Sequence, residues 1–190
     1  MTNTEDDYFV AADEPQIATI SPTTYLSLSG EGAPGSDDFY AKKEALTLVS
    51  DGLGLAGPIE IIYWFNPEHG DVGIADFYWT VPLEHLRWRI LVRVPDGTEL
   101  PPSSSAIAGL EMARQHGLAL FTMEEGKVVQ VMHHGPFGDE DKTLARLGMF
   151  ADSHELRRNG PHHEIHLDAF GRGTPQTNLK TILRDPVVSA

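Results

Sequence analysis

The 190-residue sequence contains no cysteine. This absence excludes disulfide bonds, thiolate metal sites, iron–sulfur clusters and cysteine nucleophiles. Basic residues are also few: 14 Lys and Arg stand against 28 Asp and Glu, a formal net charge of −14 at pH 7. Nucleic-acid backbones and anionic membranes attract clustered basic residues, so we expect neither as a partner. The charge instead favours neutral or cationic small ligands.

Long apolar runs are missing as well. No stretch approaches the roughly 20 residues that span a bilayer, and the first residues are acidic and polar, unlike a signal peptide. We therefore expect a cytoplasmic protein. The chain is 41% hydrophobic and long enough to bury a core. We expect a flexible acidic start over residues 1–14 and a single domain over 15–190.

Cofactor motifs are absent. Gly30-x-Gly32 lacks the spacing of a dinucleotide-binding loop, and neither a phosphate-binding loop with Gly-Lys-Ser/Thr nor a Gly-x-Ser-x-Gly elbow occurs. We therefore expect no cofactor.

Hydrophobic periodicity predicts a mixture of strands and helices. Residues 25–29 and 87–94 alternate between apolar and polar, as half-buried strands do. Ser36 is a good N-cap for a helix that begins with two acids and ends at Gly52 or Gly54. Further strands are expected at 17–20, 58–65, 76–81 and 162–167. Residues 118–134 are expected to form either one strand or a hairpin that turns near 124–127. A second helix is expected at 106–116 and a third after 135–140.

One pattern occurs twice. The strand at 25–29 leads through a Gly/Pro turn into Gly35-Ser36-Asp37-Asp38 and a helix, and the strand at 128–134 leads through a similar turn into Gly138-Asp139-Glu140-Asp141 and a helix. Repetition about half a chain apart suggests a duplicated α+β unit.

Six segments, in order, together resemble the GyrI-like (gyrase-inhibitor-like) small-molecule-binding proteins, in particular their stand-alone branch. They are Pro15-x-Ile17-x-x-Ile20 with Gly30-Glu31-Gly32-x-Pro34; Pro58-Ile59-Glu60-x-x-x-Trp64; Trp88-x-Ile90-Leu91-Val92-Arg93-Val94-Pro95-Asp96; Glu125-Gly126-x-Val128-Val129-Gln130-Val131-Met132-His133-x-Gly135-Pro136-Phe137; His162-His163-Glu164-Ile165-x-Leu167; and Leu179-Lys180-Thr181-Ile182-Leu183-Arg184-x-Pro186.

The resemblance implies an α+β fold. Two SHS2-like halves (strand–helix–strand–strand), at about 15–98 and 99–190, would form an antiparallel sheet around a central ligand cleft. Relatives bind bulky aromatic or cationic drugs, and some stand-alone members hydrolyse the cyclopropane of cyclopropanoid DNA-alkylating antibiotics. A role in antibiotic resistance or detoxification would follow. This sequence departs from the family pattern at 66–79 and at His166, where relatives often carry an aromatic residue.

The run His162-His163-Glu164-Ile165-His166 looks at first like a metal site. On a strand, His162, Glu164 and His166 share one face but span about 13 Å, so we expect no metal ion. The resemblance instead implies that Glu164 is the cleft carboxylate. Burial would raise its pKa towards neutrality and suit it to proton transfer, unless it forms a salt bridge with Arg87 or Arg89.

Other candidates have weaker support. Glu60 and Trp64 share a strand face and could line the cleft together, whereas only one of Tyr78 and Trp79 can do so on a strand. Phe137 would lie at the mouth of the cleft or plug a helix start. Tyr25 would be either core or a hydroxyl in the cleft. Glu125 at a turn and His133 on a strand are further candidate ligand contacts.

Two functions compete. A binding protein would hold a bulky compound between Trp64, Phe137 and Trp79, and Glu164 would contact the positive group of that compound. A hydrolase would use Glu164 to activate water and a second donor, Tyr25 or a protonated Glu60, to stabilise the developing oxyanion.

Overall fold

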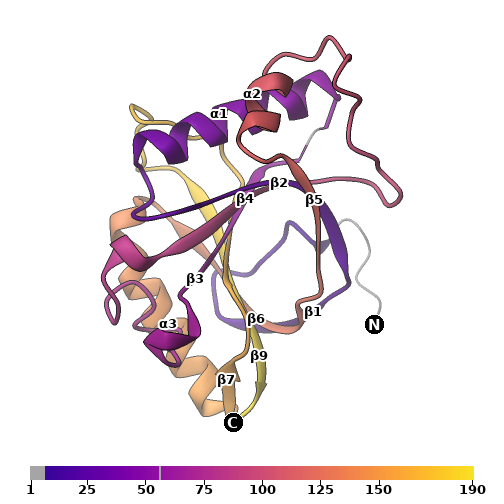
Figure 1. Cartoon of the computed structure of the whole chain (residues 1–190). Helices are drawn as coiled ribbons and strands as arrows, with labels where there is room; N and C mark the ends of the chain where they lie inside the picture. Colours follow the sequence, from indigo (N-terminus) through magenta and orange to yellow (C-terminus); the bar gives the residue numbers. More distant parts are fainter. Residues whose placement is uncertain (1–6, 56) are drawn as a thin grey trace.

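A computed structural model describes residues 7–55 and 57–190. In this part of the chain the strands join one antiparallel sheet in the order β1-β6-β9-β8-β3-β4-β2-β5, and β7 pairs with β9 outside this path (Figure 1). The strands are β1 (Gln16–Ile20), β2 (Thr23–Glu31), β3 (Ile59–Trp64), β4 (Arg87–Arg93), β5 (Ala119–Met123), β6 (Gly126–His134), β7 (Leu156–Arg158), β8 (His162–His166) and β9 (Lys180–Ser189).

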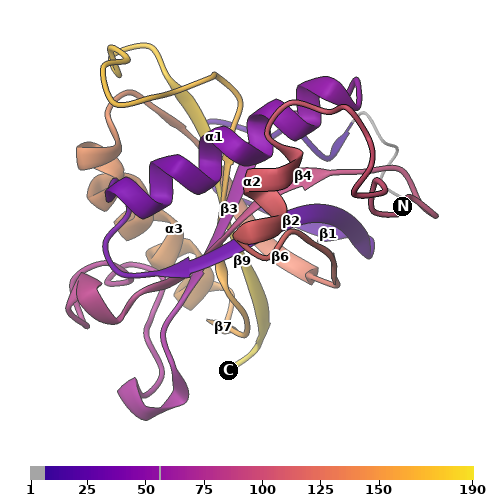
Figure 2. The same ribbon diagram turned by 45° about the horizontal axis from the view of Figure 1, so that its top comes forward.

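Two long helices pack on the same face of the sheet. Helix α1 (Asp37–Gly52) buries Leu46 and Val49 against β2, β3 and β4, and helix α3 (Glu140–Ser153) buries Leu144 and Leu147 against β6 and β9. The short helix α2 (Leu110–Gln115) packs beside α1 (Figure 2). As predicted, Ser36 caps α1, since its hydroxyl accepts a hydrogen bond of 3.2 Å from the Phe39 amide.

The N-terminal segment packs against the opposite face. Tyr8 is only 4% exposed and contacts Ile20 and Val128 there. Residues 7–14, expected to be part of a flexible start, therefore include a buried anchor. Residues 1–6 of that expected start lie outside the described residues.

Three predicted elements differ in the structure. Residues 118–134 form two strands, but not a hairpin: β5 pairs with β2, and β6 pairs with β1 and β9. Residues 76–81 form turns instead of a strand, because the Asp76 carbonyl accepts hydrogen bonds from the Trp79 and Thr80 amides. The helix expected at 106–116 begins only at Leu110, after Gly109 with its positive φ of 75°.

The predicted mixed α+β class with an antiparallel sheet is confirmed. The order strand–helix–strand–strand occurs first as β2-α1-β3-β4. It occurs again as β6-α3-β8-β9, with the short strand β7 inserted between α3 and β8. Strands β3 and β8 pair with each other at the centre of the sheet. Duplication of one ancestral unit stays a prediction. No helix in the described ranges is long and apolar enough to cross a membrane.

Close packing of one glycine generates a prediction about stability. Gly30 in β2 lies directly against the indole ring of Trp88, which is fully buried and contacts Phe39 of α1. A methyl group at Gly30 would overlap that ring, so we expect Gly30→Ala to lower the free energy of unfolding by about 1–3 kcal/mol in urea denaturation. The control Gly173→Ala, where a Cβ would meet nothing within 4 Å, should change it little. Equal stability of the two variants would contradict the packing argument.

Candidate functional site

A cavity of about 280 Å³ lies on the helix-covered face of the sheet, between the start of α1, the start of α3 and the central strands β3 and β8. We call it the aromatic cavity, because most of its walls are rings. Its lining residues are Pro34, Gly35, Phe39, Tyr40, Tyr63, Tyr78, Trp79, Leu83, Phe137, Gly138, Glu140, Glu164, His166 and Phe170.

Glu164 lines this cavity and is 4% exposed. The Tyr78 hydroxyl donates a hydrogen bond to its Oε1 atom. His166 Nε2 lies 3.1 Å from Glu164 Oε2, and His162 Nε2 lies 3.7 Å from Oε1. Burial by itself would raise the pKa of Glu164, but the two histidines outweigh it and hold that pKa well below its usual range. The prediction of a raised pKa was therefore wrong, and Glu164 is ionised at neutral pH.

A second carboxyl group, which sequence reasoning missed, faces the same cavity. Glu140 begins α3, is 4% exposed, and has a buried Oε1 atom with no hydrogen-bond partner among the described residues. Burial and the charge of Glu164 raise the pKa of Glu140 well above its usual range. The site thus holds one ionised and one protonated carboxyl group, the arrangement that general acid–base chemistry uses.

Sequence reasoning had one signal for Glu140, the acidic start of α3. Asp139 and Asp141 share that start and are exposed, while Glu140 is buried. Acids are common in the first turn of any helix, so the sequence alone does not distinguish the three residues.

A buried ion pair lies behind Glu164. His162 Nδ1 is 3.0 Å from Asp185 Oδ2, and both side chains are fully buried. Burial alone would lower the pKa of His162, but the charge and hydrogen bond of Asp185, helped by Glu164, raise it to about 9. His162 is therefore a cation that stabilises the ionised form of Glu164.

Aromatic rings enclose these carboxyl groups. The rings of Tyr63 and Tyr78 meet edge to face at 5.8 Å, and Phe137 contacts the ring of His166 at 5.3 Å. Trp79 is 59% exposed at the edge of the cavity. Phe137 and Trp79 both line the aromatic cavity. Tyr78 lines the cavity together with Trp79, because residues 76–81 turn instead of alternating as a strand.

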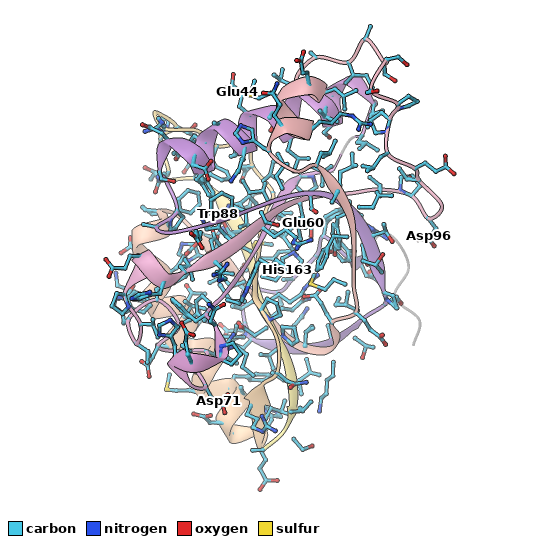
Figure 3. The ribbon with its side chains drawn as sticks, in the orientation of Figure 1. Glu44, Glu60, Asp71, Trp88, Asp96 and His163 are labelled. Atoms are coloured by element: carbon cyan, nitrogen blue, oxygen red, sulfur yellow. The ribbon has the colours of Figure 1, made fainter. Side chains whose placement is uncertain are left out.

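Three other candidates lie on the opposite face of the sheet. The Tyr8 hydroxyl contacts both Tyr25 Oη and Glu60 Oε2 at 2.6 Å. His163 bridges two carboxylates, with Nε2 2.9 Å from Glu60 and Nδ1 2.9 Å from Glu125. Figure 3 shows Glu60 and His163 pointing toward each other near the centre of the molecule.

These contacts place the predicted second donors outside the aromatic cavity. Glu60 and Ile61 are neighbours on β3, and Ile61 is the cross-strand partner of Glu164, so Glu60 points to the other face. Arg184 Nη1, 3.4 Å from Glu125, adds a second positive charge to the pair of carboxylates. Tyr25 and Glu60 therefore do not reach a ligand beside Glu164, and Tyr78 and Glu140 occupy that place instead.

Two more candidates also lie elsewhere. Trp64 lines a different cavity with Arg89. His133 connects β6 to α3, with Nδ1 2.9 Å from the Thr143 hydroxyl and Nε2 3.0 Å from the Pro136 carbonyl oxygen. Across residues 7–55 and 57–190, no three His, Asp or Glu side chains form a group that could hold a metal ion.

The buried His162–Asp185 pair generates a prediction about pH. His162 titrates near pH 6.5 when unfolded and near 9 when folded. Its stabilising effect is therefore complete below about pH 6.5 and is lost as pH rises through 9. We expect the free energy of unfolding to fall by up to about 3 kcal/mol over this interval, and His162→Gln to reduce the fall.

The control for this measurement is His154→Gln, since His154 is exposed. Chemical denaturation at a series of pH values between 6 and 9.5 gives the slope for each protein. A slope in His162→Gln that equals the slope of the unmodified protein would show that His162 carries no stabilising charge.

Comparison with known proteins agrees with this architecture. A crystal structure of an uncharacterized conserved protein from Listeria innocua superposes with a TM-score of 0.74 at 23% identity, covering 97% of each chain. A hydrolase from Listeria innocua gives a TM-score of 0.71 at 21% identity over 97% of this chain and 96% of that one. SAV2435 bound to tetraphenylphosphonium gives 0.52 at 12% identity, over 92% and 94% of the chains.

The search of curated proteins finds no match. The family model described as the GyrI-like small molecule binding domain matches residues 13–187, nearly the whole chain. The protein therefore belongs to the GyrI-like small-molecule-binding domain family.

Proposed function

We propose that the aromatic cavity binds bulky aromatic compounds of neutral or positive charge, in a role of resistance or detoxification. The observation that carries the proposal is an ionised and buried carboxylate, Glu164, that lines a cavity whose walls are mostly aromatic. Aromatic faces attract cations, and the attraction grows where water is excluded. A buried carboxylate adds a charge-assisted contact to the same ligand.

The buried charges favour a cationic ligand. Glu164 is ionised, and the His162 cation, which pairs with Asp185, lies behind it. Of these three side chains only Glu164 lines the aromatic cavity, so a ligand cation bound there would contact a negative charge. The tetraphenylphosphonium held by SAV2435 is a bulky aromatic cation, and it supports this choice of ligand class.

A binding experiment with tetraphenylphosphonium tests the proposal. We expect Glu164→Gln to weaken binding in calorimetry by roughly 1–3 kcal/mol, because one charge-assisted contact is lost. The control is Glu124→Gln, which removes one charge at an exposed position and should leave affinity unchanged at about 0.15 M salt. Equal affinities of a folded Glu164→Gln protein and the control would remove Glu164 from the binding site.

A second candidate function is hydrolysis of an activated cyclopropane. The observation that favours it is the presence of two carboxyl groups in one cavity with pKa values shifted in opposite directions. A binding protein needs one carboxylate, whereas ring opening needs a base and a separate donor. Listeria innocua proteins with a similar fold are described as hydrolases, which also favours this candidate.

In this reaction water adds across one ring bond. Glu164 accepts a proton from water as the water oxygen forms a bond to the ring CH₂. The carbon–carbon bond of the ring breaks, and its electron pair moves to the conjugated carbonyl oxygen. Glu140 donates its proton to that oxygen, giving a phenol. Proton transfer from Glu164 to Glu140 restores the site, and the net change is the addition of one water.

The Glu140→Gln variant separates turnover from binding. With a cyclopropanoid spirocyclic antibiotic, mass spectrometry should detect a product heavier by one water, at many turnovers per protein. We expect Glu140→Gln to lower kcat by about 100-fold or more while the cavity still binds tetraphenylphosphonium. Asp141→Gln, an exposed neighbour on the same helix turn, serves as control. Recovery of the intact compound with the unmodified protein would rule out hydrolysis of this antibiotic and leave binding as the function.

A further inference from the structure

A second, larger cavity lies on the face of the sheet opposite the aromatic cavity. Its volume is about 530 Å³, within the range of small-molecule sites. It is formed by the ends of β3 and β4, by β5, and by the segments 65–72 and 157–161. Ile62 and Arg89 are cross-strand partners at its inner wall. We call it the arginine cavity.

The charge of this cavity is opposite to that of the whole protein. The chain has nine arginines and a net charge of −14, yet Arg89, Arg157 and Arg158 all line this one cavity. The lining residues include a single acid, the exposed Asp71, which Figure 3 labels at the lower end of the molecule. A concentration of positive charge in an acidic protein favours an anionic ligand.

The ring of Phe121 positions the guanidinium of Arg89, which has no anionic partner in the part of the chain that the structure describes. It stacks on the Phe121 ring at 4.1 Å, and its buried Nε atom has no hydrogen-bond partner among the described residues. Arg87, two positions earlier on the same strand face, differs because it forms an ion pair with Glu31 at 3.4 Å. A partly buried cation without a counter-ion is costly, and a bound anion would remove that cost.

The other two arginines of the cavity, Arg157 and Arg158, differ in their hydrogen-bond partners. Arg158 is held in place by hydrogen bonds to the carbonyl oxygens of Val72 and Gly160, and its guanidinium lies 4.9 Å from the Phe77 ring. Arg157 is exposed, and its side chain forms no hydrogen bond or ion pair with any residue in the described ranges. Arg89 and Arg157 therefore have donors free for a ligand.

The other walls of the arginine cavity indicate that the uncharged part of the ligand is apolar and aromatic. Ile62, Trp64 and Phe121 present apolar and aromatic surface beside Arg89. A planar guanidinium forms paired hydrogen bonds with a carboxylate or a sulfonate, and the rings provide stacking surface. We propose that the arginine cavity is a second ligand site that binds an aromatic monoanion through Arg89. This site is separate from the proposed function, because it lies on the other face of the sheet.

A matched pair of probes tests the proposal. The anion 2-naphthoate and the neutral 2-naphthamide have the same ring system and similar shape, so their difference in affinity isolates the charge. We expect calorimetry at about 0.15 M salt to give at least tenfold tighter binding of 2-naphthoate. Arg89→Gln should abolish this preference, whereas Arg87→Gln, which removes the same charge from the same strand face, should retain it.

Two further measurements keep the test decisive. Arg157→Gln changes an exposed side chain that the fold does not need, and we expect it to reduce the preference for 2-naphthoate even if Arg89→Gln fails to fold. Saturating tetraphenylphosphonium should not displace 2-naphthoate, because the two ligands would occupy different faces. Equal affinity for the two naphthyl probes, an equal loss in Arg87→Gln, or displacement by tetraphenylphosphonium would each overturn the proposal.

Discussion

Strand β8 buries four ionisable side chains at the centre of the sheet, and the surrounding structure supplies their partners. All five residues from His162 to His166 are buried. Because side chains alternate along a strand, His162, Glu164 and His166 face the helices. His163 faces the N-terminal segment on the other side of the sheet. Unpaired charges in such positions would cost several kcal/mol each. Asp185 on the helix side and Glu60 with Glu125 on the other side provide the compensation.

The two networks differ in their contact with a cavity. Around His163, carboxylates, a tyrosine and Arg184 contact one another, and none of them lines the aromatic cavity or the arginine cavity. Around Glu164, the side chains of Glu140 and His166 also line the aromatic cavity, and Glu140 Oε1 has no hydrogen-bond partner among the described residues. A network away from a cavity stabilises and positions strands, while one that lines a cavity offers donors and acceptors to a ligand. This difference explains why a strand rich in histidine and glutamate contributes structure on one face and a candidate site on the other.

The sheet also separates two cavities of different chemistry. The cavity between α1 and α3 has aromatic walls and carboxyl groups, and the cavity beside β4 and β5 has arginines. The carboxylates of one cavity and the arginines of the other would pair with each other if they shared a single pocket. The central strands keep them apart, because successive residues of β3, such as Tyr63 and Trp64, point to opposite faces.

Much of the local structure could be predicted from the sequence, because alternation, capping and turn residues act over short distances. The strand at 87–94, the Ser36 cap and the position of Glu164 on a strand face are examples. The single strand or hairpin expected at 118–134 was wrong, since two strands form there and each pairs with strands far away in sequence. A local pattern does not reveal which distant strand competes for pairing.

The sequence by itself determined which residues share a face of each strand, the acidic character of the chain and its likeness to a ligand-binding family. Only the tertiary structure decided which of those faces meets a cavity. It placed Glu60 and Tyr25 in a buried network away from both cavities, placed Glu140 and Tyr78 beside Glu164, and left Arg89 Nε without a hydrogen-bond partner among the described residues. The physical reason is that both faces of the sheet are covered, so alternation alone does not distinguish a ligand-facing residue from a core residue. The protonation states followed from the same packing, because burial and neighbouring charges set them.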